Sequence, residues 1–222
     1  MPNYNAHTYF GMRVLEELSP QARASCVEDL AVFRTALYGP DPLIFCSVRA
    51  KQLSDYLHKT WRTQCLPELE RAIRLGSGTQ RSFAAGYLLH QLLDDAVHPY
   101  IYRWMAEGSV HMHLEVALDR IILDEMGADK PPHLATLDRK RTAQAAAGFI
   151  HPATEEQYSA GLVRMSLVTD LLRRREAKVL TRVTRMEGEQ ARQLRKVLEE
   201  TISPASGHLS GLLESFSYAS GI

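Results

Sequence analysis

One stretch of the sequence places three side chains that commonly bind metals at equal steps. In AAGYLLHQLLDDAVHPY, from Ala84 to Tyr100, the residues His90, Asp94 and His98 follow one another at intervals of four. Apolar residues recur there at steps of three and four, which predicts an amphipathic helix. A step of four advances about 40° around a helix and about 6 Å along it, so the three side chains line one face. Burying such a row is costly unless a cation satisfies it, and a divalent metal ion would do so.

A second stretch repeats this pattern. HMHLEVALDRIIL carries His111, Glu115 and Asp119 at steps of four, with apolar residues on the flanks. Nitrogen and oxygen ligands with no nearby cysteine suit zinc in a hydrolytic site, or manganese or iron. Asp119, one turn beyond Glu115, is a candidate hydrogen-bond partner for a ligand histidine.

Simpler interpretations compete with a metal site. A single His-x-x-x-Asp pair on a helix is more often an intrahelical hydrogen bond. Two such rows in one chain, with a third histidine in the first, favour a metal. Asp95 lies about 100° from Asp94 around the helix, and we expect it to be a solvated charge. His113 likewise lies off the helix face that carries His111 and Glu115, so we consider it only as an alternative ligand.

The composition does not indicate electrostatic binding to nucleic acid or to an anionic membrane. The 222 residues include 26 Lys and Arg and 26 Asp and Glu, so the formal charges balance. The start of the chain lacks a basic region followed by an apolar run, and no stretch approaches the apolar length of a membrane span. The three cysteines, Cys26, Cys46 and Cys65, are widely spaced and form no CxxC pair. This pattern predicts reduced thiols in a cytoplasmic protein. The start of the chain predicts that there is no signal peptide.

Helix signals cover the part of the chain that precedes the first row. The expected helices span about residues 6–18, 20–37 and 48–75. YGPDP, at residues 38–42, breaks the second of them with glycine and two prolines. Taken alone, Asp41 in this turn is typical of a backbone cap, and His58 is typical of a buried core histidine. Pro99 directly follows His98, so the central helix should end, kink or restart there.

The C-terminal part of the sequence also reads as helical. Expected helices span about residues 134–149, 154–179 and 204–218. Lys130-Pro131-Pro132 is a stiff connector, and the run from Arg173 to Arg175 opens an Arg- and Glu-rich solvated face. Because strand signals are almost absent, the predicted fold is all-α, a multi-helix bundle. We expect residues 1–127 to form a metal-binding core and residues 128–222 to add helices to it within one domain.

Four segments together resemble the zinc-dependent phospholipase C family, which is related to the single-strand-specific zinc nucleases. They are AHTYFG near the start, YGPD, AAGYLLHQLLDDAVHPY and HMHLEVALD, in the order expected for the family. The resemblance covers about residues 1–127. It implies a helical fold around a cluster of about two or three zinc ions.

The resemblance also implies which residues bind the metals. His7 matches the ligand of a metal shared with the N-terminal residue. Asp41 and His58 match residues that complete the shell of another metal with His90, which replaces the cap and core interpretations given above. Asp94 matches a carboxylate that bridges two metals. The remaining cluster consists of His98, His111 and Glu115.

Two features depart from the family pattern. Secreted members use a processed N-terminal tryptophan as a ligand, whereas this sequence begins with Met1-Pro2. One metal position is then incomplete, differently ligated or empty. The interval between His98 and His111 is also shorter than in the secreted enzymes, which leaves little room for loops that shape a substrate pocket.

The implied activity is phosphoester hydrolysis by a metal-activated hydroxide, with Asp41 as the catalytic residue that orients or deprotonates water. The expected substrate is a phospholipid or a soluble phosphodiester or phosphomonoester, and the sequence has no convincing amphipathic segment for a bilayer. Nucleic acid is a less favoured substrate. A nuclease would need aromatic stacking platforms, and the available aromatic residues have the spacing of core positions. These are Tyr87, Tyr100, Tyr102 and Trp104.

Two other classes of protein remain as alternatives. In the first, the metals are structural, and the C-terminal helices form a surface for a partner or for self-association into a homo-oligomer. A structural site would be saturated by protein ligands, whereas a catalytic site keeps open positions. In the second, a di-iron carboxylate bundle, paired Glu-x-x-His motifs would be required, and the rows here are spaced by four.

Overall fold

Every regular element that the structure describes is a helix. The structure is a computed structural model, and it describes residues 4–127, 138–172 and 183–219, within which no strand occurs. The all-α prediction is therefore confirmed. The helices are α1 (Tyr4–Glu17), α2 (Pro20–Cys26), α3 (Leu30–Ala36), the 3-10 helix η1 (Asp41–Phe45), α4 (Val48–Gln64), α5 (Leu66–Leu75), α6 (Gly78–Ala106), α7 (His111–Glu125), α8 (Arg139–Ala146), α9 (Glu155–Leu172) and α10 (Arg185–Ala219).

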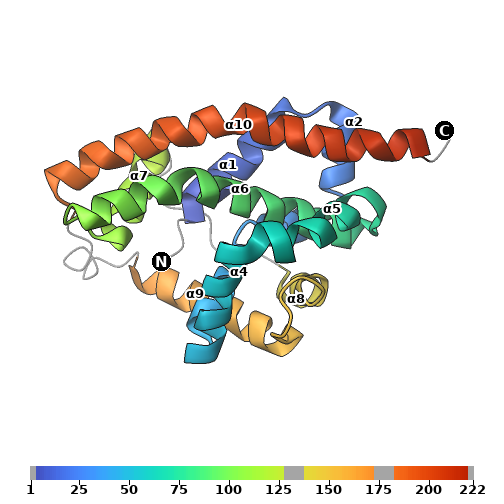
Figure 1. Cartoon of the computed structure of the whole chain (residues 1–222), viewed down its shortest axis with the longest axis horizontal. Coiled ribbons are helices and arrows are strands. Elements are labelled where there is room, and N and C mark those ends of the chain that lie inside the picture. Colours follow the sequence, from blue (N-terminus) through green and yellow to red (C-terminus); the bar gives the residue numbers. More distant parts are fainter. Residues whose placement is uncertain (1–3, 128–137, 173–182, 220–222) are drawn as a thin grey trace.

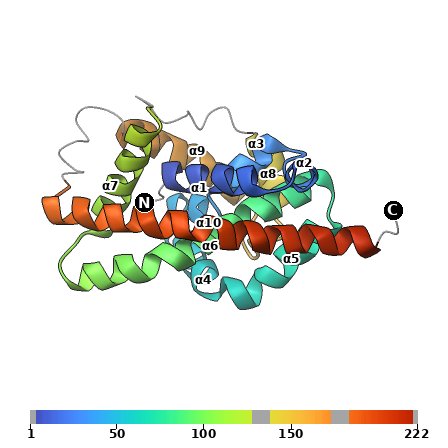
Figure 2. The ribbon, with the colours of Figure 1, turned by 90° about the horizontal axis from the view of Figure 1, so that it is seen from above.

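Helix α6 forms the centre of the fold. Most of its residues between Ser82 and Val97 are buried, including all of those from Ser82 to Gln91. Helix α10 runs along one side of α6, and α4, α8 and α9 lie on the other side (Figure 1). Seen from above, α1 lies beside α10 and contacts both α10 and α6 (Figure 2). A helix buried on most of its circumference can present polar side chains only to the protein interior, so the row on α6 faces other elements.

Two expected helices are each divided in the structure. The segment expected over 20–37 is broken between α2 and α3, because Asp29 caps α3 through a hydrogen bond from the Val32 N–H. The segment expected over 48–75 is broken at Cys65, where Pro67 occupies the first turn of α5. A proline in the first turn favours a helix start, because the N–H that it lacks has no partner within the helix there.

Two prolines lie inside helices that were expected to begin or end near them. Helix α6 continues through Pro99, and α10 continues through Pro204 from a start at Arg185. The prediction of a helix that begins at Ser203-Pro204 is therefore wrong, and α6 neither ends nor restarts at Pro99. Both prolines are exposed, so water can satisfy the carbonyl group that each leaves unpaired.

The remaining sequence predictions fall partly outside the described residues. The connector at 130–132 and the arginine run at 173–175 both lie there. Helix α8 is shorter than the helix expected over 134–149, and α9 is described as far as Leu172. Among the described helices, none has the length and the apolar character needed to cross a membrane.

Candidate metal centre

The fold brings all eight predicted ligands to one region. They form three groups in which a ligand atom from each residue lies within 4.8 Å of the others. Such buried groups of imidazole and carboxylate could hold a metal ion. The groups are His7 with His90 and Asp94, Asp41 with His58 and His90, and His98 with His111 and Glu115.

His7 is placed by the start of α1. The carboxylate of Asp119 on α7 accepts hydrogen bonds from the backbone N–H groups of Asn5 (3.3 Å) and Ala6 (3.0 Å). These are N–H groups of the first turn, which have no partner within the helix, and a carboxylate is favoured at this end. Asp119 was expected to hydrogen-bond to a ligand histidine. Its carboxylate instead contacts the first turn of α1, the helix that carries the ligand His7.

Asp41 is placed by a tight turn that packs on α6. Gly39 has φ +48, and a Cβ atom there would overlap the imidazole ring of His90. The Tyr158 hydroxyl on α9 donates a hydrogen bond of 2.7 Å to the Gly39 carbonyl oxygen. A Cβ at Gly161 would overlap the Pro42 carbonyl, so α9 crosses η1 at close range. The C-terminal part of the chain therefore supports the turn that carries Asp41.

The orientation of two histidines indicates a cation between them. His58 donates from Nδ1 to the Ser54 carbonyl oxygen (2.8 Å), and His90 donates from Nδ1 to the Leu37 carbonyl oxygen (3.1 Å). A carbonyl oxygen only accepts, so each Nδ1 carries a proton and each neutral ring has its lone pair on Nε2. The two Nε2 atoms lie 3.1 Å apart. Two lone pairs that face each other at this distance need a proton or a metal ion between them.

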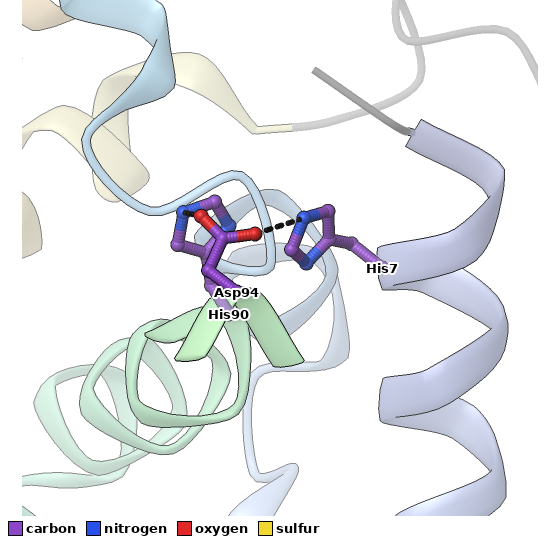
Figure 3. Close-up of side chains that lie close together, drawn as sticks. All are labelled: His7, His90 and Asp94. Atoms are coloured by element: carbon purple, nitrogen blue, oxygen red, sulfur yellow. Dashed lines mark ion pairs between the residues drawn. The ribbon is translucent and has the colours of Figure 1, made fainter. Parts of the chain in front are cut away.

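Asp94 connects this pair to His7. Its Oδ2 lies 3.3 Å from Nε2 of both His58 and His90, and its Oδ1 lies 3.2 Å from Nε2 of His7. Figure 3 shows His7 projecting from α1 toward the Asp94 carboxylate, with His90 and Asp94 both on α6. The rings of His7 and His90 stack with centroids 4.3 Å apart. Asp41 adds an oxygen 3.3 Å from Nε2 of His58. In a tetrahedral site with bonds of about 2.0–2.1 Å, ligand atoms are about 3.3–3.4 Å apart, so these separations fit a zinc ion.

The third group is more open. Nε2 of His111 lies 2.8 Å from Oε1 of Glu115, while Nε2 of His98 lies 3.9 Å from the same oxygen. Nδ1 of His98 lies 3.7 Å from Oδ2 of Asp94. The last two separations are too long for hydrogen bonds, and they leave room for an ion between the side chains. The Tyr102 ring stacks on the His98 ring with centroids 5.4 Å apart.

The three carboxylates of the centre are ionised at neutral pH. Burial alone would raise the pKa of Asp94, but the imidazoles of His98, His90 and His7 hold it well below its usual value. Burial likewise works against the ionised form of Asp41, yet the hydrogen bond from His58 lowers its pKa. The hydrogen bond from His111, together with the nearby imidazole of His98, outweighs burial at Glu115 and lowers its pKa to about 2. The centre therefore offers three negative charges to a cation.

The histidines of the centre differ from one another. Burial alone would lower the pKa of His58, but hydrogen bonds to Asp41 and Asp94 raise it well above its usual value. The pKa of His98 is also raised despite burial, mainly by the charge of Asp94. Burial is the dominant influence on His90, whose pKa is lowered. In the metal-free protein, His58 and His98 therefore hold a proton up to a higher pH than an ordinary histidine does, and a metal ion must displace that proton.

Zinc binding is therefore expected to release protons. Because the carboxylates are already ionised, the protons must come from the two histidines whose pKa is raised, His58 and His98. We expect zinc binding to release about one or two protons per chain at neutral pH. Affinity should fall as the pH decreases through the raised pKa values of these histidines, since protons then compete better with the metal. Isothermal titration of zinc in buffers with different ionisation enthalpies measures the number released. A binding enthalpy that is independent of the buffer would contradict the expectation.

Helix α10 contacts the start of α7, the helix that carries His111 and Glu115. The buried carboxylate of Glu187 accepts a hydrogen bond of 3.0 Å from the Val110 N–H at the start of α7, and it lies 3.1 Å from Nδ1 of His113. It also accepts hydrogen bonds from the backbone and hydroxyl of Thr184. His113 thus links α7 to α10, and its role as an alternative ligand is not supported.

Asp95 is not simply solvated, as was expected. It accepts a hydrogen bond of 3.0 Å from Nε1 of Trp61, and its other oxygen lies 2.6 Å from the Arg62 guanidinium. Among the aromatic residues, Tyr87 and Trp104 are buried as expected, whereas Tyr100 and Tyr102 are exposed. The three cysteines are free.

The centre opens to solvent through a pocket of about 380 Å³. Its wall includes seven of the eight predicted ligands, all except the fully buried His90. It also includes Tyr102, one of the aromatic residues considered in the sequence analysis. Three further lining residues were not indicated by the sequence, because their positions depend on how α4, η1 and α6 meet: Ile44, Asp55 and Lys59.

Comparison with models of known protein families, with curated proteins and with solved structures found no match for this chain.

Proposed function

We propose that this protein is a metal-dependent phosphoester hydrolase, with zinc as the metal and a chemistry like that of the zinc-dependent phospholipases C. One observation carries the proposal: Nε2 of His58 lies 3.1–3.3 Å from Nε2 of His90, from Oδ2 of Asp94 and from Oδ1 of Asp41, beside an open pocket. A structural metal site is usually closed by its protein ligands. Access from the pocket instead favours a centre at which a substrate can bind.

The residues of the centre fit a group of divalent ions. His58 and His90 have Nε2 lone pairs fixed by hydrogen bonds to backbone carbonyl oxygens, a common arrangement behind metal-binding histidines. Asp94 presents one oxygen to each side, as a bridging ligand does. His98, His111 and Glu115 would hold a further ion.

The protein side chains have separate tasks in the proposed reaction. When bound, divalent zinc supplies a Lewis acid that provides a nucleophilic hydroxide near neutral pH and neutralises charge on a phosphoryl group. Asp41 remains ionised, so its carboxylate can orient a water molecule or accept its proton. Apolar packing of α3 and α6 holds Leu37 and His90 in place, which keeps the donor atoms preorganised.

The substrate class can be tested directly with the zinc-loaded chain. We expect hydrolysis of bis(p-nitrophenyl) phosphate that is abolished by a chelator and restored by zinc. Emulsified phosphatidylcholine and single-stranded DNA, assayed in parallel, distinguish a phospholipase from a nuclease. p-Nitrophenyl acetate serves as a control for unspecific zinc-promoted hydrolysis. Zinc-loaded protein that cleaves no phosphoester would contradict the proposal and leave a structural role for the metals.

A further inference from the structure

One positive charge stands at the mouth of the pocket. Among the lining residues that belong to the described parts of the chain, Lys59 is the only lysine or arginine. It follows the predicted ligand His58 on α4, and both side chains line the pocket. The Lys59 side chain is exposed, and it makes no ion pair with any residue in the described parts of the chain.

The nearest acidic residue on the same helix does not neutralise this charge. Asp55 also lines the pocket, and a spacing of four residues would allow it to pair with Lys59. Its carboxylate instead lies 2.8 Å from Nζ of Lys51, one turn in the other direction. The other carboxylates of the pocket face the histidines of the centre. The ammonium group of Lys59 is thus available to a molecule that enters.

We propose that Lys59 forms a subsite for the second negative charge of a phosphomonoester. This inference rests on the proposed function and narrows its substrate class. A phosphodiester carries one negative charge, which metal ions bound at the centre can neutralise. A phosphomonoester carries about two negative charges near neutral pH. A lysine binds phosphate as a mobile point charge, and it can follow the phosphoryl oxygens without taking a place among the metal ligands.

The test compares two esters that have the same leaving group. For p-nitrophenyl phosphate and bis(p-nitrophenyl) phosphate, we expect Lys59→Met to lower the ratio of kcat/KM, monoester over diester, by about tenfold, as loss of one charge contact would. Lys59→Arg keeps the charge and should restore most of the ratio. Lys196→Met makes the same change in net charge at an exposed position on α10 outside the pocket, and should leave the ratio unchanged.

A binding measurement separates this inference from the proposed function. Inorganic phosphate titrated into the zinc-loaded protein should bind about tenfold more weakly to Lys59→Met than to wild type, with an unchanged zinc content in both. If neither ester is cleaved but this loss is seen, the subsite stands and the hydrolase proposal fails. Equal kcat/KM ratios in wild type and Lys59→Met, or phosphate binding that does not depend on Lys59, would overturn the inference.

Discussion

Replacing Asp94 with asparagine is expected to lower the zinc content of the centre and to lower phosphoesterase activity by at least about 100-fold. The reason is the position of the carboxylate, whose two oxygens face His7 on one side and His58 with His90 on the other. An amide has only one oxygen, carries no charge and cannot bridge two ions. Zinc content by plasma mass spectrometry and the diester assay measure both effects.

The adjacent residue provides a matched control. Asp95→Asn makes the same chemical change one position along α6, where the carboxylate contacts Trp61 and Arg62 and does not face the centre. We expect this variant to keep its zinc and its activity, and circular dichroism should show that both variants remain helical. Asp94→Asn with wild-type zinc content and activity would contradict the assignment of Asp94 as the central ligand.

Replacing Gly39 with alanine should damage both the stability and the centre. A non-glycine residue at φ +48 costs about 1–2 kcal/mol, and the new methyl group would overlap the His90 ring, with overpacking typically costing about 1–3 kcal/mol. We therefore expect the free energy of unfolding to fall by about 2–5 kcal/mol. Movement of His90 away from the methyl group should also reduce zinc affinity. Chemical denaturation and zinc titration measure these changes.

Gly127→Ala isolates the backbone part of this effect. Gly127 also has a positive φ, +63, but no atom of the other described residues contacts the position that its Cβ would take within 4 Å. Its replacement should cost only the conformational strain of about 1–2 kcal/mol and leave zinc affinity unchanged. If the two variants lose equal stability and bind zinc alike, the close packing of the turn on His90 is not what positions this ligand.

The local sequence pattern was sufficient to predict the all-α fold and the rows of histidines and carboxylates on α6 and α7. The period of four puts His90, Asp94 and His98 on one face, and the helix that carries them is present as expected. That the rows meet Asp41 and His58 depends on tertiary packing, and only the resemblance to a family suggested it. Whether these residues bind metal stays a prediction.

Other features could not be read from spacing because they depend on contacts between distant segments. Asp119 holds the start of α1, and Glu187 holds the start of α7, across separations of more than seventy residues. Lys59 becomes part of a pocket only when α4 lies against the centre. The helix start predicted at Pro204 was wrong because exposure to water, which lets a helix continue through a proline, is a property of the folded chain.

The metal content of the wild-type protein, purified without a chelator, tests the central claim most directly. Plasma mass spectrometry should find about two or three zinc equivalents per chain, or uptake of that amount when zinc is added to depleted protein. Protein that contains no metal and takes up none would contradict the account. The imidazoles and carboxylates of the centre would then form a proton-linked hydrogen-bond network, with a proton between His58 and His90.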